Sequence, residues 1–369
     1  MTAAPPDPSD LFGTPYESAA ADFAARVQAA VLGAQEVQAM HLGDRLGWYR
    51  ELALTGPLTS SQLASRTGTD ERYAREWLEH QAACGYVAVD DVTADASARR
   101  FRLPVGHAEV LCDEDSLLYL APLARITAAT SQQLPALLEA YRAGGGVSWA
   151  TFGPDAREAQ GAANRPLFLH QLAQQLLPAV PDLDARLRAG ARVADVGCGE
   201  GWSSIGLALG YPAVTVTGFD VDEPSLEAAR RHAEDAGVTD RVSFVGGDAA
   251  TAAGTFDVVL AVECIHDMPD PVSVLAGMRR LAGRDGAVVV VDERTQEEFT
   301  APADPWERIL YGWSITCCLP DGRSGGPSVE TGTVMRPATM ARYAAEAGFG
   351  RTEILPIEHD AFRFYRLHV

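Results

Sequence analysis

Three short segments rich in glycine and aspartate are the part of this sequence best suited to bind a small ligand. The first is Asp195-Val196-Gly197-Cys198-Gly199-Glu200-Gly201, the second ends in Asp220, 23 residues after Gly197, and the third is Gly247-Asp248-Ala249. Glycines allow a sharp turn and bring a ligand close to the N-terminus of the next helix. A carboxylate such as Asp220 can accept hydrogen bonds from two ribose hydroxyls, and Asp248 can accept one from an exocyclic amine. The three segments together predict a site for a nucleotide-like ligand.

The glycine spacing narrows the class of ligand. Dinucleotide-binding enzymes favour G-x-G-x-x-G, whereas here the third glycine, Gly201, comes one position early. Each residue alone also has a structural interpretation. Gly197 and Gly199 allow close packing of a strand on a helix. Asp220 could cap the next helix, and Asp248 could form a turn. Packing alone does not require acids at the ends of consecutive strands, and this favours a bound nucleoside.

After residue 190 the chain alternates short apolar runs with helical patterns. Strands are predicted at 193–196, 214–219, 242–245, 258–262, 287–291, 354–357 and 362–367. Helices are predicted at 202–209, 224–236, 271–281 and 339–347. This alternation predicts a parallel sheet with helices on both faces. Because parallel strands end at one edge of a sheet, the three acidic segments should meet there.

On these residues the C-terminal half resembles the class I S-adenosylmethionine-dependent methyltransferases. The resemblance rests on the D-x-G-x-G-x-G loop at 195–201, on Asp220 and Asp248, and on Phe256-Asp257-Val258-Val259 at the start of the fourth strand. It implies an α/β fold with a Rossmann-like seven-stranded domain and S-adenosyl-L-methionine as the cofactor. The cofactor-binding residues that it implies are Asp195, Gly197, Gly199, Gly201, Asp220, Val221, Asp248 and Ala249.

The segment from Glu263 to Asp270 is similar to the leucine-histidine-aspartate-tryptophan-x-aspartate motif of small-molecule O-methyltransferases. The similarity implies that His266 is a general base, and Asp267 would orient it or cap the next helix. Met268 stands where the motif has tryptophan, so His266 could instead be a loop residue above the cofactor. Glu263 would contact the substrate or the amino group of the cofactor, or be a buried structural carboxylate.

The N-terminal half has the pattern of a winged helix–turn–helix. A helix is predicted at 21–46, a capping box opens a short helix at Thr59, and Asp70 caps a second helix that ends at Gly85, before a two-stranded wing. The second helix has four acidic residues against two arginines, a net charge of −2, whereas a DNA reader needs a basic stripe. This half resembles the dimerisation domain of bacterial and plant small-molecule O-methyltransferases, which implies a homodimer.

The whole chain then falls into four predicted segments. They are a flexible tail at 1–20, a winged-helix dimerisation domain at 21–110, a helical bridge contributing to the substrate pocket at 111–185, and an S-adenosylmethionine-binding domain at 186–369 with a lid insertion at 293–336. Aromatic and polar side chains of the bridge and the insertion could enclose a planar substrate, or those of the insertion could form its own small core. They are Trp149, Phe152, Phe168, His170, Trp306, Tyr311, Trp313, Cys317 and Cys318.

Composition limits the possible functions. The 369 residues include 30 basic ones, all arginine, and 50 acidic ones, for a net charge of −20. This charge repels nucleic acid and anionic membranes, and no apolar run approaches the ~20 residues that cross a bilayer. Six cysteines without a C-x-x-C pair indicate reduced, cytoplasmic thiols, and no ligand spacing predicts a metal.

We therefore expect an enzyme that methylates a small molecule, at a hydroxyl of an aromatic or secondary metabolite. The alternatives are a winged-helix DNA-binding regulator and a methyltransferase-fold protein that catalyses a non-methylating step.

Overall fold

The computed structural model describes residues 16–369 and divides into two compact units, Met1–Cys112 and Asp113–Val369. Most of the expected tail, residues 1–15, lies outside the described residues. The remainder of it differs from the expectation, because helix α1 begins at Tyr16 and residues 16–20 are helical. The alanine-rich run after Ser18 is a strong helix former, and it continues the helix beyond the polar, proline-rich start of the chain.

The first unit is a small helical domain with a two-stranded wing. Its elements are α1 (Tyr16–Arg45), α2 (Trp48–Thr55), α3 (Ser60–Thr67), α4 (Glu71–Ala83), β1 (Ala88–Val89), β2 (Phe101–Arg102) and α5 (Val105–Cys112). The predicted capping box is confirmed, since the side chains of Thr59 and Gln62 each accept a hydrogen bond from the other residue's backbone N–H. Asp70 caps α4 as predicted. Helix α2 was not predicted from the sequence.

Helix α2 supplies much of the core of the first unit. Trp48, Tyr49 and Leu52 are buried, and the Trp48 ring lies 4.8 Å from the Trp77 ring of α4. Helix α1 is different, because large apolar side chains along it are exposed. They are Phe23, Val27, Val31, Leu32 and Leu42.

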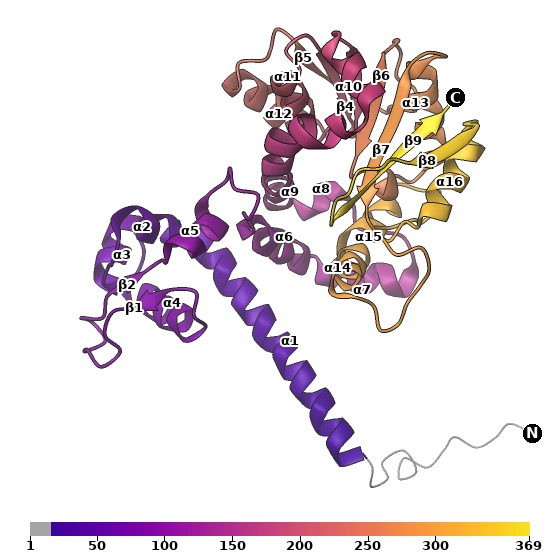
Figure 1. Ribbon diagram of the computed structural model, residues 1–369. Coiled ribbons are helices and arrows are strands. Elements are labelled where there is room, and N and C mark those ends of the chain that lie inside the picture. The colour runs from indigo at the N-terminus through magenta and orange to yellow at the C-terminus, as the bar shows by residue number, and fades with distance from the viewer. Residues whose placement is uncertain (1–15) are drawn as a thin grey trace, which may run out of the picture. The chain divides into compact units, whose positions relative to one another are not determined.

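The second unit is built on a seven-stranded sheet with the order β5-β4-β3-β6-β7-β9-β8 (Figure 1). The strands are β3 (Arg192–Val196), β4 (Thr215–Asp220), β5 (Val242–Gly246), β6 (Val258–Val262), β7 (Ala287–Glu293), β8 (Arg351–Ile354) and β9 (Phe362–His368). Strands β3 to β7 are parallel, and β9 is antiparallel to β7 and β8. Strands β4 and β5 are added on one side of β3, and β6 and β7 are added on its other side. The carboxyl ends of β3 and β6 therefore border the topological switch point, where such sheets bind ligands.

One predicted strand is displaced along the chain. Strand β8 ends at Ile354, where the predicted strand 354–357 begins. Pro356 explains the difference, because proline has no N–H to donate to a neighbouring strand. Leu355 and Ile357 are nevertheless buried, so the apolar pattern correctly marked core residues.

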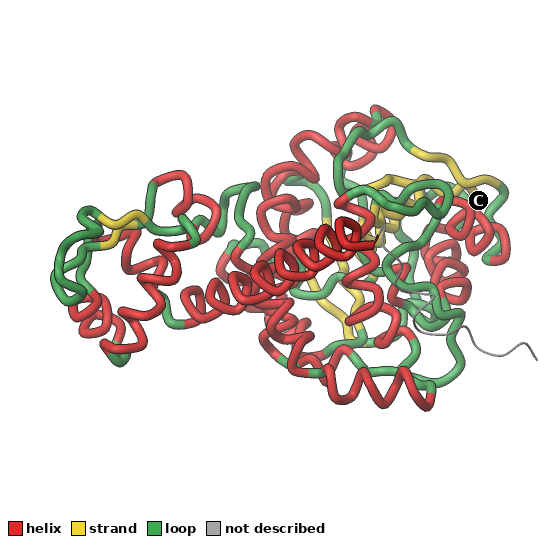
Figure 2. The backbone as a smooth tube through the Cα atoms, turned by 90° about the horizontal axis from the view of Figure 1, so that it is seen from below, coloured by secondary structure: helices red, strands yellow, loops and turns green. Residues whose placement is uncertain are grey.

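Helices cover both faces of the sheet, and in Figure 2 the strands (yellow) run between helices (red). Successive residues of a strand point to opposite faces: Val193 belongs to one buried cluster and Ala194 to the other. The first cluster includes the π-helical segment η2 (Phe168–Leu176), the short η3 (Leu177–Ala179), α10 (Pro181–Arg188), α11 (Trp202–Gly210) and α12 (Glu223–Asp235). The second includes α13 (Pro271–Ala282) and α16 (Pro337–Glu346).

Two further helical segments pack against each other near the sheet. The first holds α6 (Ala121–Gln132), α7 (Leu134–Ala143), α8 (Trp149–Phe152) and α9 (Pro154–Leu167). The second is the insertion between β7 and α16, with α14 (Pro305–Trp313), the π-helical η5 (Ser314–Cys318) and α15 (Leu319–Gly322). The N–H of Val147 donates to the carbonyl of Pro320 at 3.0 Å, and the N–H of Trp149 donates to Asp321 Oδ1 at 2.7 Å. These contacts fix the insertion to the helical segment.

Candidate active site

The glycine loop connects β3 to α11 and has space for nothing larger than glycine at two positions. Gly197 and Gly201 have φ angles of 70° and 82°, which favour glycine. A Cβ on Gly197 would lie 2.7 Å from Cys264 Sγ, and one on Gly201 would lie 2.7 Å from the Phe244 ring. Gly199 also has a positive φ, but a Cβ there would meet open space. The loop therefore packs tightly at both ends and is open at its middle.

The Asp195 side chain binds the first turn of the helix that follows this loop. Its Oδ2 accepts hydrogen bonds from the hydroxyls of Ser203 and Ser204, both at 2.6 Å, in the first turn of α11. Its Oδ1 is buried and has no hydrogen-bond partner among the described residues. Burial raises the pKa of this carboxyl to about 6.

Asp220, at the end of β4, faces the open middle of the loop. Its Oδ2 accepts from the Gly199 N–H at 2.8 Å, and its Oδ1 accepts from the Asp222 N–H at 2.9 Å. Burial raises its pKa. Each carboxylate oxygen has a second lone pair, so Asp220 can accept further hydrogen bonds from a ligand. The next residue, Val221, is 77% exposed and offers an apolar surface.

Asp248 and Ala249 follow β5 on the same edge of the sheet. Asp248 is exposed, and its Oδ1 accepts from the Ala250 N–H at 2.8 Å, whereas Ala249 is buried. A cleft of about 390 Å³ opens beside Asp248; it is lined by Thr217, Phe219, Val245, Gly246, Gly247, Asp248, Thr251, Ala252, Ala253 and Phe256. Neither the 197–201 loop nor His266 lines this cleft, so it is separate from the groups that carry chemistry.

His266 lies in the short helix η4 (Ile265–Asp267) after β6, and it is surrounded by carboxylates. Its Nδ1 lies 2.7 Å from Asp292 Oδ1 and 3.0 Å from Glu293 Oε2, at the end of β7. Its Nε2 lies 3.2 Å from Asp267 Oδ1. Only 3% of His266 is exposed. Asp267 thus contacts the imidazole as one prediction had it, whereas Asp270 caps α13 through the Ser273 N–H.

The surrounding carboxyl groups determine the protonation of the His266 imidazole. Burial alone would lower the pKa of His266, but the three acids around it outweigh burial and raise that pKa well above its usual value. Burial also opposes ionisation of Asp292, yet contact with the imidazole leaves its pKa lowered. Burial raises the pKa of Glu293 well above its usual value. The buried ion pair therefore joins His266 and Asp292.

Asp292 and Glu293 are functional candidates that the sequence analysis missed. The apolar pattern ended the predicted strand at Val291, and β7 continues through Glu293. The available signal was the pair of acids directly after an apolar strand, at the same edge of the sheet as Asp195 and Asp220. A pair of acids at that position on a parallel sheet points toward the ligand-binding edge.

Glu263 comes at the end of β6 and is held by helix α9. It has a φ of 52°, a left-handed conformation that residues other than glycine rarely adopt. Its Oε2 accepts from Asn164 Nδ2 at 2.5 Å and from Gln160 Nε2 at 3.4 Å. Burial raises its pKa to about 7. Local strain at a polar, ligand-binding edge is typical of functional residues.

Helix α9 contacts the carboxyl edge of the sheet at two more points. Arg157 forms a bidentate ion pair with Asp222, with Nε–Oδ2 at 2.7 Å and Nη2–Oδ1 at 3.0 Å. Gly161 packs so closely on the Glu200 side chain that a Cβ would collide with it. Burial raises the pKa of Glu200 to about 7. Helix α9 therefore covers the segments that follow β3, β4 and β6.

Most of the aromatic candidates contact other residues of their own unit. Phe152 and Cys317 share a small buried cluster, and Phe168 belongs to the core that covers one face of the sheet. His170 is exposed, with Nε2 3.7 Å from Asp115. Trp306 and Trp313 are half-buried, and their rings pack edge-to-face with centroids 5.8 Å apart. Tyr311 accepts a hydrogen bond from Arg336, and Trp149 is fixed by Asp321.

Known families match both units. The methyltransferase domain matches residues 187–317, and the Rv2258c-like winged HTH domain matches residues 37–113. The ubiquinone biosynthesis O-methyltransferase of Thiobacillus denitrificans is 32% identical over 183 residues, which cover 48% of this chain and 73% of that protein. The chain belongs to the S-adenosylmethionine-dependent O-methyltransferases. S-adenosylmethionine is accordingly the cofactor of this methyltransferase.

Solved structures extend the likeness to almost the whole methyltransferase. Mitomycin 7-O-methyltransferase MmcR aligns with a TM-score of 0.73 at 23% identity, covering 95% of this chain and 99% of that one. Human N-acetylserotonin methyltransferase, solved with S-adenosylmethionine, aligns with a TM-score of 0.71 at 16% identity, covering 94% and 97%. At these identities the likeness shows the fold. No helix within residues 16–369 of the methyltransferase is long and apolar enough to span a bilayer.

The residues present fit the cofactor. The open middle of the loop at Gly199 leaves room for a ligand against the backbone. Asp220 keeps free acceptor capacity beside that opening, and the unpartnered Oδ1 of Asp195 lies buried beneath the same loop. Carboxylate acceptors suit both ribose hydroxyls and a cationic ligand.

Proposed function

We propose that this methyltransferase methylates a hydroxyl of a small planar metabolite and that His266 accepts the hydroxyl proton. The pairing of His266 Nδ1 with Asp292 Oδ1 at 2.7 Å supports the proposal most directly. The names of the relatives, among them enzymes of ubiquinone biosynthesis, mitomycin and N-acetylserotonin methylation, support a small-molecule acceptor.

Three strand ends would hold the cofactor. Asp195, Gly197, Gly199 and Gly201 would form the wall against its methionine part, with Asp195 acting through the loop that it supports. Asp220 would accept from the ribose hydroxyls. Val221 and Ala249 would flank the adenine, and Asp248 would accept from its exocyclic amine. When bound, S-adenosylmethionine supplies a methyl group on a positively charged sulfonium.

The pairing with Asp292 leaves one ring nitrogen of His266 available to accept a proton. Asp292 accepts the Nδ1–H and so leaves Nε2 as the atom that can take a proton. Asp267, 3.2 Å from Nε2, marks the side from which a hydroxyl would approach. A protonated imidazole cannot act as a base, and the raised pKa of His266 reflects three nearby acids. The positive charge of the bound sulfonium opposes those acids and favours the neutral imidazole. General-base catalysis of this kind contributes about 10²–10⁴ to the rate.

Glu263 and helix α9 would close the site. The contacts of Asn164 with Glu263 and of Arg157 with Asp222 hold α9 over the strand ends. We propose that Glu263 faces the amino group of the cofactor and that α9, with the 293–336 insertion as a lid, excludes water from the transfer step. The segment 111–185 would thus contribute to the substrate pocket.

The first unit would make a homodimer. Phe23, Val27 and Val31 recur every four residues along one side of α1 and are exposed, which is the pattern of a helix that packs on a partner. The six free cysteines suit a reducing, cytoplasmic compartment.

The test is an acceptor screen with radiolabelled S-adenosylmethionine and a panel of phenols, hydroxyquinones and aliphatic alcohols. We expect a product heavier by one methylene, stable to base as an ether is, together with S-adenosylhomocysteine. Cofactor binding without any methylated product across the panel would contradict the proposal. Products rearranged without gain of mass would favour a non-methylating reaction.

A further inference from the structure

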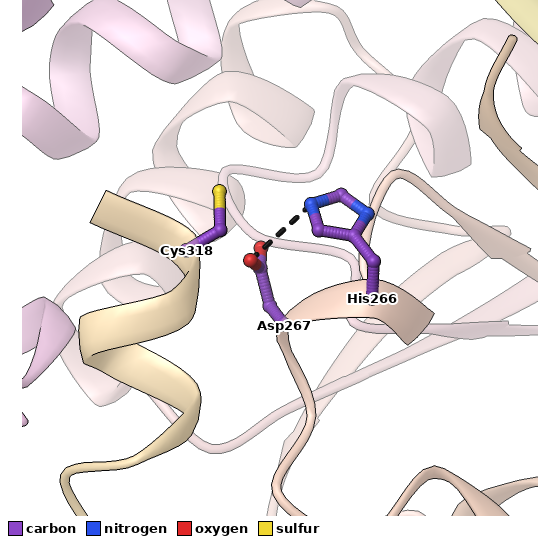
Figure 3. A group of neighbouring side chains, drawn as sticks. All are labelled: His266, Asp267 and Cys318. Carbon is purple, nitrogen blue, oxygen red and sulfur yellow. Dashed lines mark ion pairs between the residues drawn. The ribbon is translucent and has the colours of Figure 1, made fainter. Parts of the chain in front are cut away.

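The side chains of His266, Asp267 and the insertion residue Cys318 form a cluster, and Cys318 has no part in the proposed methyl transfer. Figure 3 shows the three side chains converging, two from η4 and one from η5. One nitrogen, one oxygen and one sulfur, one from each residue, lie within 4.8 Å of one another. Cys318 is half-buried, the Asp267 side chain is 36% exposed and His266 is buried, so the cluster lies at the border between the interior and solvent.

We propose that this cluster binds a zinc ion through His266 Nε2, an Asp267 carboxylate oxygen and Cys318 Sγ, and that bound zinc inhibits methyl transfer. Imidazole, carboxylate and thiolate are the ligands that zinc takes in proteins, and three of them leave a fourth position for water. Two charges, from the carboxylate and the thiolate, balance the charge of Zn²⁺. The S–H bond of Cys318 and the Nε2–H bond of the protonated His266 break when the Zn–S and Zn–N bonds form, and both protons go to solvent.

One of the three distances between the proposed ligand atoms already matches a zinc site. Ligands about 2.0–2.1 Å from a tetrahedral zinc ion lie roughly 3.3–3.4 Å apart. The distance between His266 Nε2 and Asp267 Oδ1 is 3.2 Å. Asp267 Oδ1 is buried, and its charged neighbour is His266 Nε2, so a ligand oxygen already lies beside the ring nitrogen.

Asp292 supplies the support that zinc-binding histidines normally have. A metal-bound histidine almost always donates its other ring N–H to a carboxylate, which fixes the ring. His266 does this through Nδ1 at 2.7 Å from Asp292 Oδ1. A second group of possible ligands consists of His266, Asp292 and Glu293. All three are buried, and Nδ1 of His266 is already paired with Asp292 there. The ion is therefore expected on the Nε2 side.

Inhibition follows from the position of the ion. Zinc on Nε2 occupies the lone pair that would accept the hydroxyl proton. The metal site itself does not depend on the proposed function, whereas its inhibitory effect does. The two are measured separately for that reason.

Binding is tested with Co²⁺ as a spectroscopic substitute for zinc, on tag-free full-length protein without cofactor. We expect one equivalent of Co²⁺ and a thiolate-to-cobalt charge-transfer band. Cys318→Ser should abolish that band and weaken binding at least about 100-fold, and Asp292→Asn should weaken it by about 10–100-fold. Cys84→Ser is the control, because Cys84 lies in the first unit. Cys317 is less suitable, since its thiol is in an apolar cluster.

The result that overturns the site is a wild-type protein without the band, or a Cys318→Ser protein that keeps it. Inhibition is tested by adding Zn²⁺ to methyl-transfer assays. With each rate taken relative to the same protein without zinc, we expect Cys318→Ser to need at least tenfold more zinc for half-inhibition. Equal sensitivity of the two proteins, or activation by zinc, would refute the inhibitory role while the Co²⁺ result stands on its own.

Discussion

Replacing Asp220 with asparagine tests the assignment of the cofactor site. Asp220→Asn keeps the shape of the side chain and one carbonyl oxygen, but it removes the charge and half of the acceptor capacity. The native carboxylate already accepts from the N–H groups of Gly199 and Asp222, at 2.8 and 2.9 Å. In the variant, the amide N–H₂ must face one of these two donors. The remaining oxygen can then serve only one ribose hydroxyl well.

The expected loss follows from these contacts. A hydrogen bond to a charged group contributes about 1.5–3 kcal/mol and a neutral one about 0.5–1.5 kcal/mol. Exchanging two charged bonds for one neutral bond costs about 2–4 kcal/mol, because such contributions are not fully additive. The dissociation constant should therefore rise by about 30- to 1,000-fold.

Isothermal titration with S-adenosylhomocysteine and with S-adenosylmethionine measures this loss directly. Asp240→Asn is the matched control, because Asp240 is an exposed acid before β5, away from the loop. Its affinity should equal that of the wild type, and the Tm of both variants shows that the fold is retained. If folded Asp220→Asn binds within threefold of the wild type, the ribose contact is refuted and the adenosine must lie elsewhere.

Other variants test the remaining assignments. His266→Ala should lower kcat by about 10²–10⁴ while the cofactor dissociation constant stays within threefold, and Asp292→Asn should lower kcat in the same way because Nδ1 loses its partner; single-turnover kinetics and calorimetry separate the two effects. Burial raises the pKa of Glu200 from 4.5 to about 7, so its contribution to stability is present below pH 4.5 and is lost as the pH rises through 7. Urea unfolding at pH 5 and pH 8 should show Glu200→Gln gaining up to about 3 kcal/mol over the wild type, and an unchanged difference would show that Glu200 is solvated. Sedimentation should find a dimer for the wild type and a monomer for Phe23→Asp/Val27→Asp, and a dimer that survives both charges would exclude α1 as the interface.

Local patterns predicted the framework of the site. The glycine loop and Asp220 directly follow apolar strands, and Asp248 comes two glycines after one, so strand prediction alone placed them at one edge. The capping box at Thr59 and Gln62 was predictable for the same reason, since its partners are three residues apart. Physical rules that act within a few residues of the chain are readable from the sequence.

Contacts between distant segments could not be predicted from local sequence patterns. Asp292 is 26 residues from His266, and its role depends on β7 lying next to β6 in the sheet. Asn164 is 99 residues from Glu263, and nothing in the polar pattern of α9 names the strand end on which it packs. Phe168 could equally have lined a pocket, and only the fold places it in the core.

The electrostatics of the site connect these distant contacts with the chemistry. Three carboxyl groups surround one buried imidazole, and Asp195 and Asp220 add two more at the carboxyl edge, so acidic groups there outnumber the one basic group. Such an arrangement costs stability in the absence of a ligand, because buried like charges repel. It becomes favourable when a cation arrives, and the sulfonium of the cofactor is one. The same excess would draw in any cation, but only the thiol of Cys318 adds a soft ligand that selects zinc over the hard cations. In the proposed site the acids would account for cofactor affinity, and Cys318 alone would account for the metal selectivity.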